Sequence, residues 1–246
     1  ICGEDTGFKI TPDQLEKAIN ESTKWFILNP PSNPTGSCYT KDELIALSKV
    51  LENHPHVNIM TDDLYEHLIY DDIQFHTLVS VAPFLKDRTL TLNGVSKAYA
   101  MTGWRIGYAG GNQDLIKAMG KLQSQSTSNP TSISQAAAVE ALNGDNSFIA
   151  ERSQVFKKRR DNLISELNSM NGISCRKPEG AFYVFPSCQG IIGKTDNSGK
   201  IISNDQEFTT SLLEQAGVAV VQGSAFGLEG YFRISYATSD ENLEEA

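Results

Sequence analysis

Apolar residues in the first hundred positions follow two different spacings, which predict alternating helices and strands. At Thr11 and at Thr40, a threonine is followed three positions later by Gln or Glu, a pairing that opens helices, and apolar residues then recur at helical spacing. Short apolar runs typical of buried strands lie between and after these helices, at 24–29, 57–61, 88–93 and 104–109. Strands separated by helix-length segments indicate βαβ units and a largely parallel sheet.

The pattern changes after residue 112, where consecutive segments have helical spacing. These predicted helices cover 112–124, 132–142 and 146–168. Shorter elements follow, with a helix that opens near 203–206 and strand-like runs at 172–177, 181–186, 218–221 and 231–237. A segment rich in Gly, Ser and Asn predicts an exposed loop over 189–204. The long third helix can bridge two domains, so we predict one domain over 1–147 and a second over 148–246.

Composition and charge narrow the classes of protein that this chain can belong to. The net charge is −9 with no basic block, which argues against a nucleic-acid or anionic-membrane surface. No apolar window is long enough to predict a transmembrane helix. The four cysteines show no spacing typical of a metal site, and they favour reduced thiols in a cytoplasmic protein. The chain starts without methionine, and we expect it to be an excerpt of a longer protein.

Polar residues follow three of the predicted strands, at the point where each strand ends. Asn33 comes after the first strand, Asp62 after the second and Lys97 after the third. Ligands of open α/β sheets bind at the carboxyl ends of the strands. We therefore expect these three side chains to converge on one pocket, although each is about thirty residues from the next.

The side-chain types at these strand ends suit one cofactor. A lysine in a pocket can form a Schiff base, and a buried aspartate can keep a pyridinium nitrogen protonated. Tyr65, three residues after Asp62, can donate to a phenolate oxygen of the same ring. Arg105 and the backbone of residues 94–96 can receive a phosphate dianion. Pyridoxal 5'-phosphate has all of these groups.

Each of these residues also has a structural explanation that requires no catalytic role. The segment NPPSNPTG can be a plain turn, Asp62 can cap a helix, and a lysine that follows a serine usually faces solvent. Arg105 is harder to explain in this way, because a charge within a predicted apolar strand needs a partner. The joint occurrence of these residues at the strand ends favours the cofactor site over the separate readings.

The same segments carry a resemblance to a known family. The sequence contains, in order, NPPSNPTG, DDLYE, GVSKAYAMTGWRIGY, EGAFYVFP, GSAFG and FRISYATS. This combination resembles the class I aminotransferases, and most closely their bacterial aspartate aminotransferase subgroup. The resemblance covers essentially the whole chain. It implies the pyridoxal-phosphate-dependent transferase fold, with a mostly parallel central sheet, helices on both of its faces and a smaller C-terminal α+β domain.

The resemblance implies a role for each residue that contacts the cofactor ring. Lys97 is the residue that binds the cofactor covalently and that moves a proton between the substrate Cα and the cofactor. Asp62 pairs with the pyridine nitrogen. Tyr65 and Asn33 hydrogen-bond the phenolic oxygen of the ring.

The resemblance also implies which residues bind the phosphate and the substrate. Arg105 binds the phosphate, with Ser96 as a weaker candidate. Some relatives have a serine in place of Gly94, so the backbone of Gly94 can replace a hydroxyl contact there. Arg233, assisted by Asn33, corresponds to the arginine that binds the substrate α-carboxylate with both arms of its planar fork. A structural ion pair is the alternative role for Arg233.

The resemblance predicts an aminotransferase that moves the amino group of aspartate to 2-oxoglutarate by a ping-pong mechanism. Prephenate or another keto acid is an alternative acceptor, and a different pyridoxal-phosphate reaction, such as that of a β-lyase, is an alternative chemistry. A regulatory domain that binds the cofactor without catalysis is a third possibility. The family forms homodimers with shared active sites. Its phosphate-binding glycine loop and the aromatic ring that stacks on the cofactor are expected in about 150 residues before this sequence.

Overall fold

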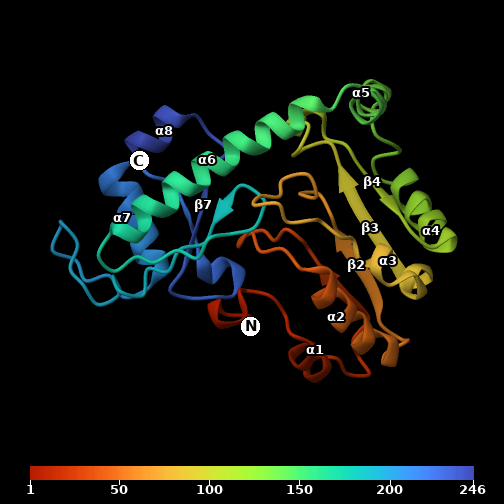
Figure 1. The fold of residues 1–246 in the computed structure, drawn as a ribbon, viewed down its shortest axis with the longest axis horizontal. Coiled ribbons are helices and arrows are strands. Elements are labelled where there is room, and N and C mark those ends of the chain that lie inside the picture. Colours follow the sequence, from red (N-terminus) through yellow and green to blue (C-terminus); the bar gives the residue numbers. More distant parts are fainter. The chain divides into compact units, whose positions relative to one another are not determined.

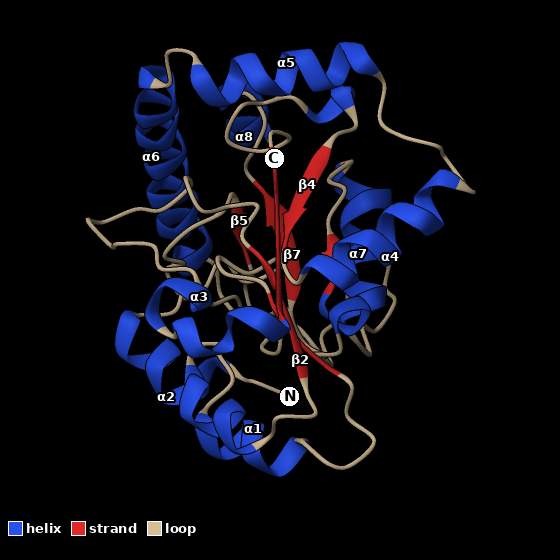
Figure 2. Cartoon of the chain, turned by 90° about the vertical axis from the view of Figure 1, so that its right-hand side faces the viewer, coloured by secondary structure: helices blue, strands red, loops and turns tan.

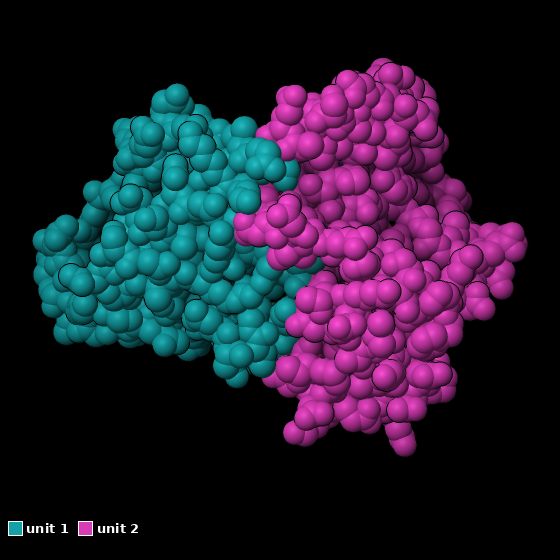
Figure 3. All heavy atoms as spheres, in the orientation of Figure 1, with its two compact units in different colours: residues 1–9, 32–38, 153–246 teal, residues 10–31, 39–152 magenta.

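The computed structural model describes residues 1–246, and the chain divides into two compact units (Figure 3). We call residues 10–31 and 39–152 the N-terminal unit, and residues 1–9, 32–38 and 153–246 the C-terminal unit. The division falls inside a long helix and assigns two early segments to the later part of the chain. The two compact units are therefore not separated by a single boundary near residue 147. The division into one domain over 1–147 and a second over 148–246 stays a prediction.

A four-stranded sheet organises the N-terminal unit (Figure 1). Its strands, in both chain order and spatial order, are β1 (Trp25–Leu28), β2 (Asn58–Asp62), β3 (Thr89–Gly94) and β4 (Gly107–Gly110). The first three strands are parallel, as predicted, whereas β4 runs antiparallel to β3. The carboxyl ends of β2 and β3 therefore lie next to each other, with Asp62 opposite Leu92.

Helices cover both faces of this sheet. An aliphatic core that includes Leu44, Leu47 and Ile59 joins one face to α1 (Pro12–Ala18), α2 (Lys41–Asn53) and α3 (Leu78–Val81). On the other face lies α4 (Gln113–Ser124), which is followed by α5 (Ser132–Asn143) (Figure 2). Thr11 and Thr40 each form both hydrogen bonds of a capping box, which confirms the two predicted helix starts.

The C-terminal unit has little regular β structure. Its sheet has the order β5-β7-β6, with β5 (Tyr183–Val184), β6 (Val221–Gln222) and β7 (Phe232–Ser235) all antiparallel. The helices of this part of the chain are α6 (Ser147–Ser169), which begins in the N-terminal unit, α7 (Asp205–Ala216) and α8 (Asp240–Glu245). The core is rich in aromatic rings, among them Phe156, Phe182 and the fully buried Tyr236.

Several of the predicted strands are shorter than expected or absent, and 181–186 is a strand only over Tyr183–Val184. The run at 104–109 becomes a strand only from Gly107, because residues 102–104 form a 3₁₀ turn that ends at Arg105 in the left-handed region, with φ of 49°. The run at 172–177 makes only one isolated bridge, from Ser174 to Ser187. Of the run at 218–221, only Val221 is in a strand. None of the helices is both long enough and apolar enough to cross a bilayer.

Candidate active site

Asp62 and Lys97 occupy the ends of neighbouring strands in the N-terminal unit. Asp62 is the last residue of β2, and Lys97 comes three residues after the end of β3. The side chain of Asn29, which follows β1, donates a hydrogen bond to the Asp62 carbonyl at 3.0 Å. The ends of three adjacent parallel strands are thereby joined. The sheet holds Asp62 and Lys97 at one edge, as the strand pattern predicted.

The Asp62 carboxylate is partly buried, and the positive charge of Lys97 lies nearby. Burial raises its pKa, and a hydrogen bond from the Leu64 backbone N–H and the charge of Lys97 offset only part of this effect. A carboxylate in this position would be stabilised by a further cation. A protonated pyridine nitrogen is a cation of the size and charge that such a site accepts.

Tyr65 joins Lys97 at this edge of the sheet. Its ring is buried, and the Lys97 Nζ lies 5.7 Å from the ring centroid. A turn over residues 64–67, directly after β2, brings Tyr65 to Lys97.

A cavity of about 630 Å³ opens beside the strand ends, and its lining includes Asp62, Ser96 and Arg105. Residues of β3, β4 and α4 also line it, among them Leu92 and Ile116. A carboxylate, a hydroxyl and a guanidinium residue thus border one space. These are the groups that pyridoxal phosphate requires for its ring nitrogen and its phosphate.

Arg105 reaches this cavity from a different backbone position than the one we predicted. It lies outside β4, on the exposed left-handed residue that ends the preceding turn, and its Nη1 donates to the Thr102 carbonyl at 2.8 Å. A buried charge in an apolar strand is therefore the wrong explanation for Arg105. Its exposure leaves the guanidinium group open to an anion from solvent.

Gly94 has a structural reason to be a glycine. It is buried at the end of β3, and a Cβ there would lie 3.3 Å from both the Gly107 Cα and the Ile106 carbonyl oxygen. Its backbone N–H already donates to Asn93 Oδ1 at 2.7 Å. The close contact between β3 and β4 accounts for Gly94, and Ser96 and Arg105 are better placed for a phosphate.

A second set of predicted residues lies in the C-terminal unit. Arg233, on β7, donates from Nη1 to the side-chain oxygen of Asn33 at 2.7 Å. The Arg233 Nε is buried and has no hydrogen-bond partner. A buried N–H donor without an acceptor is unfavourable, and a ligand carboxylate would satisfy it. The alternative reading of Arg233 as part of a structural ion pair has no support, since its partner is an amide.

Two aromatic rings hold the Arg233 guanidinium group in place. The Arg233 Cζ lies 4.7 Å from the Tyr183 ring centroid and 5.1 Å from the Phe226 ring centroid. Such cation–π contacts orient a planar group while its N–H edges stay available to a ligand. The sequence analysis did not assign a role to either ring, although both occur in quoted motifs, EGAFYVFP and GSAFG.

Comparison with known proteins identifies the family. The family model described as aminotransferase class I and II matches residues 2–246. The chain belongs to this family. It is 60% identical over 245 residues to an aspartate/prephenate aminotransferase of Cereibacter sphaeroides, matching 100% of the chain and 61% of the relative. The family assignment and the transferase fold predicted from the motifs are thus confirmed.

Solved aminotransferases have the same fold. The aspartate aminotransferase of Rhizobium meliloti superposes with a TM-score of 0.96 at 55% identity, over 99% of this chain and 61% of that one. The Thermus thermophilus aspartate aminotransferase solved with maleate gives a TM-score of 0.87 at 39% identity, over 99% and 60%. The chain thus spans about three fifths of the length of these relatives.

Pyridoxal phosphate is the cofactor of this family, and the residues at the strand ends fit it. Asp62 suits the ring nitrogen, Lys97 the covalent attachment, and Arg105 and Ser96 the phosphate. The N-terminal unit holds all four residues, whereas Asn33 and Arg233 belong to the C-terminal unit. Convergence of the two sets on one pocket stays a prediction.

Proposed function

We propose that the protein is a pyridoxal-phosphate-dependent aminotransferase that moves the amino group of aspartate to 2-oxoglutarate in ping-pong half-reactions. The observation that carries the proposal is the cavity at the ends of β2 and β3, where Asp62, Ser96 and Arg105 border one space and Lys97 lies beside Tyr65. The names of the relatives support aspartate as the donor. The protein acts as a cytoplasmic homodimer with shared sites, by analogy with its family.

Asp62, Ser96 and Arg105 of the strand-end cavity, together with Lys97 and Tyr65 at the same edge of the sheet, bind the cofactor and move the proton. The bound cofactor supplies an electron sink for the bond between the substrate Cα and its hydrogen. Lys97 Nζ would hold the cofactor covalently and would take the proton from the substrate Cα as its amine. The Asp62 carboxylate would keep the ring nitrogen protonated, and Tyr65 would donate to the ring oxygen. Arg105 and Ser96 would hold the phosphate.

Arg233 and Asn33 orient the substrate. Asn33 accepts one N–H of Arg233 Nη1, the buried Nε–H has no acceptor, and the guanidinium N–H groups that remain are the donors for the α-carboxylate. Tyr183 and Phe226 keep the guanidinium plane from rotating. The α-carboxylate is common to all amino acids, so these residues fix the orientation of Cα and do not select the substrate side chain.

A half-reaction tests the proposal. Aspartate is added to the complete, cofactor-loaded protein without a keto acid, and the absorbance of the bound cofactor is followed. We expect conversion to the spectrum of the pyridoxamine form with one oxaloacetate per cofactor, and recovery of the first spectrum on addition of 2-oxoglutarate. Formation of alanine and carbon dioxide instead of oxaloacetate, by loss of the β-carboxylate, would replace transamination with lyase chemistry.

Prephenate is a second candidate acceptor, because the relative at 60% identity is an aspartate/prephenate aminotransferase. In the same experiment, prephenate takes the place of 2-oxoglutarate in the second half-reaction. Recovery of the first spectrum by prephenate, at a rate comparable to that with 2-oxoglutarate, would establish the broader activity. Recovery by 2-oxoglutarate alone would exclude prephenate as an acceptor.

A further inference from the structure

The loop that carries Asn33 is held against residues 176–180 within the C-terminal unit. Gly36 has a positive φ of 68°, and a Cβ at this position would lie 2.5 Å from the Pro178 Cβ and 2.6 Å from the Gly180 carbonyl oxygen. The Gly180 N–H donates to the Gly36 carbonyl at 2.8 Å. The two segments therefore touch through their backbones, and the position of one restricts the position of the other.

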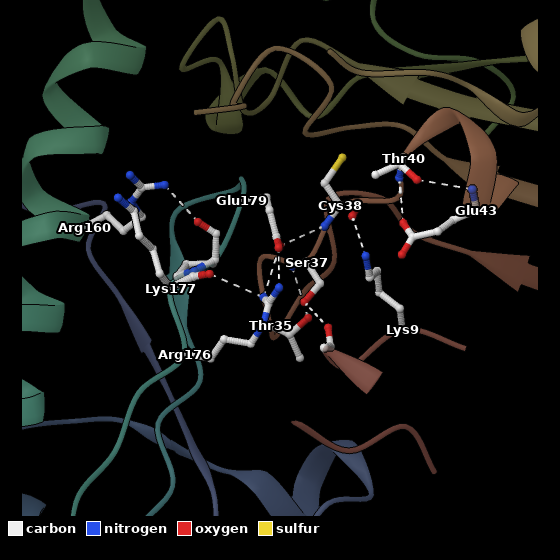
Figure 4. A network of polar contacts seen from close by, with 12 residues as sticks. Lys9, Thr35, Ser37, Cys38, Thr40, Glu43, Arg160, Arg176, Lys177 and Glu179 are labelled. Atoms are coloured by element: carbon white, nitrogen blue, oxygen red, sulfur yellow. Dashed lines mark hydrogen bonds and ion pairs between the residues drawn. The ribbon is translucent and has the colours of Figure 1, made fainter. Parts of the chain in front are cut away.

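Glu179 is the side chain that links these two segments (Figure 4). Its Oε2 accepts the Cys38 backbone N–H at 3.3 Å and an N–H of Arg176 at 3.2 Å. Arg176 also donates to the Oε1 of Glu179, so the pair is bidentate. The two side chains are only 19% and 27% exposed, which protects the pair from water.

Further bonds tie the same loop to the first residues of the chain. The Ser37 hydroxyl donates to the Gly7 carbonyl at 2.8 Å, and the Lys9 amine donates to the Cys38 carbonyl at 3.4 Å. Arg176 lies over Gly7, with Nη2 3.4 Å from the position of a Cβ there. The Arg176–Glu179 pair thus lies where three segments of the C-terminal unit meet.

We infer that Glu179, fixed by Arg176, is a positioning residue for the α-carboxylate site. It holds the 32–38 loop by the Cys38 N–H, and the loop in turn places the Asn33 oxygen on Arg233 Nη1. Without this bond the loop has more freedom, and Asn33 no longer presets the guanidinium orientation. The bonds of Glu179 go to Cys38 and Arg176, so it acts on Arg233 only through the loop. The inference depends on the proposed function, because it assumes that Arg233 binds a carboxylate.

A double-mutant cycle tests this role in the complete, cofactor-loaded protein. The dissociation constant of maleate, a dicarboxylate bound by the Thermus relative, is measured with Glu179→Ala in the wild-type and Asn33→Ala backgrounds. We expect Glu179→Ala to raise this constant roughly tenfold in the wild type and less than about twofold in Asn33→Ala. Glu179→Gln keeps an acceptor for the Cys38 N–H and should give a smaller rise, roughly threefold.

Two readouts separate positioning from general damage. The amount of lysine-bound cofactor per chain, determined from its absorbance, should stay unchanged in every Glu179 variant, because Lys97 belongs to the other unit. Lys200→Gln is the matched control, since it removes an exposed ion pair of the same unit, 3.8 Å from Glu207, and should leave maleate binding unchanged. If Glu179→Ala does not fold, as judged by thermal unfolding, the cycle is carried out with Glu179→Gln.

An equal loss in both backgrounds would overturn the inference, as would unchanged maleate binding in Glu179→Ala. Failure of the wild type to bind maleate would remove the carboxylate site itself and the inference with it. The proposed function is tested separately, by the half-reaction with aspartate, because maleate binding requires no turnover. A wild type that binds maleate but transfers no amino group would refute the proposed function and leave the cycle interpretable.

Discussion

In the N-terminal unit the candidate site residues follow paired parallel strands, whereas in the C-terminal unit they are held by loops and stacked rings. Asp62 ends β2 and Lys97 comes shortly after β3, so the sheet itself determines their spacing. Arg233 lies on a strand of four residues, and its orientation depends on Asn33, Tyr183 and Phe226, which come from separate segments. Cofactor chemistry is thus assigned to the regular unit and carboxylate binding to the irregular one.

The cores of the two units differ in the same way. The N-terminal unit packs aliphatic side chains between helices and sheet, and Leu44 and Leu51 are completely buried. In the C-terminal unit, Phe156 lies against Phe182 and Tyr236 with ring centroids 5.6 and 6.2 Å apart. A sheet with an aliphatic core supports side chains at strand ends, whereas a core of rings with little backbone pairing needs specific polar contacts to fix a loop.

The largest effect is expected from removal of the amine in the N-terminal unit. Lys97→Ala removes both the covalent attachment and the base at Cα, so turnover should fall by at least roughly 10⁴-fold. The absorbance of the lysine-bound cofactor should disappear, which is measured on the purified protein. Lys117→Ala removes an exposed lysine on α4 and is the matched control, with unchanged spectrum and rate. Retained turnover in Lys97→Ala would contradict the assignment of chemistry to this unit.

The fold of the N-terminal unit was largely predictable because its signals are local. Capping boxes and short apolar runs predicted its first two long helices and its three parallel strands, and strand polarity then placed Asp62 and Lys97 at one edge. The strand at 104–109 was wrong at its start because the residues after Met101 form a tight turn, which apolar content does not reveal. The position of Arg105 followed from this turn.

The C-terminal unit was harder to predict because its decisive contacts are not local. Tyr183 and Phe226 are 43 residues apart, and an aromatic residue in a short apolar run is normally a core residue. The run at 172–177 has strand-like composition, but Pro178 directly after it lacks a backbone donor, and the run makes only one isolated bridge. The motifs of the family located Arg233, whereas the residues that orient it required the structure.

The next largest effect is expected from the C-terminal unit. Arg233→Ala should lower kcat/KM roughly 100-fold, because a charged ligand group loses its hydrogen-bonded partner. The loss should be similar for aspartate and for amino acids with other side chains, since all carry the α-carboxylate. Arg233→Lys should recover little of it, because a lysine lacks the planar fork that stacks between Tyr183 and Phe226.

Steady-state kinetics with several amino donors measure this prediction, and the cofactor spectrum serves as its control. The spectrum should be that of the wild type, because Lys97 and Asp62 are intact. A loss confined to dicarboxylic donors would mean that Arg233 reads the substrate side chain. The C-terminal unit would then bind the side-chain carboxylate of the substrate, and not the α-carboxylate as we propose.

An effect on stability alone, and none on turnover, is expected for Asp63, which separates stability from chemistry within the N-terminal unit. Asp63 is adjacent to Asp62 but almost fully buried, and burial, together with the charges of Glu66 and Asp62, raises its pKa from 3.8 to about 6. Between pH 3.8 and about 6, Asp63 is therefore protonated in the folded state and ionised in the unfolded state. The free energy of unfolding should fall by about 3 kcal/mol as the pH rises from 4 to above 6.

Asp63→Asn places a neutral group of the same shape at this position and should remove that fall. Denaturant unfolding at a series of pH values from 4 to 7 measures it, with Asp72→Asn, an exposed carboxylate in the same unit, as the control that keeps the wild-type slope. The half-reaction with aspartate should proceed in Asp63→Asn, because Asp62 and Lys97 remain. An unchanged pH slope would show that Asp63 is ionised in the folded protein at little cost. The strand end would then tolerate two adjacent charges, and burial alone would not distinguish Asp62 as the partner of the ring nitrogen.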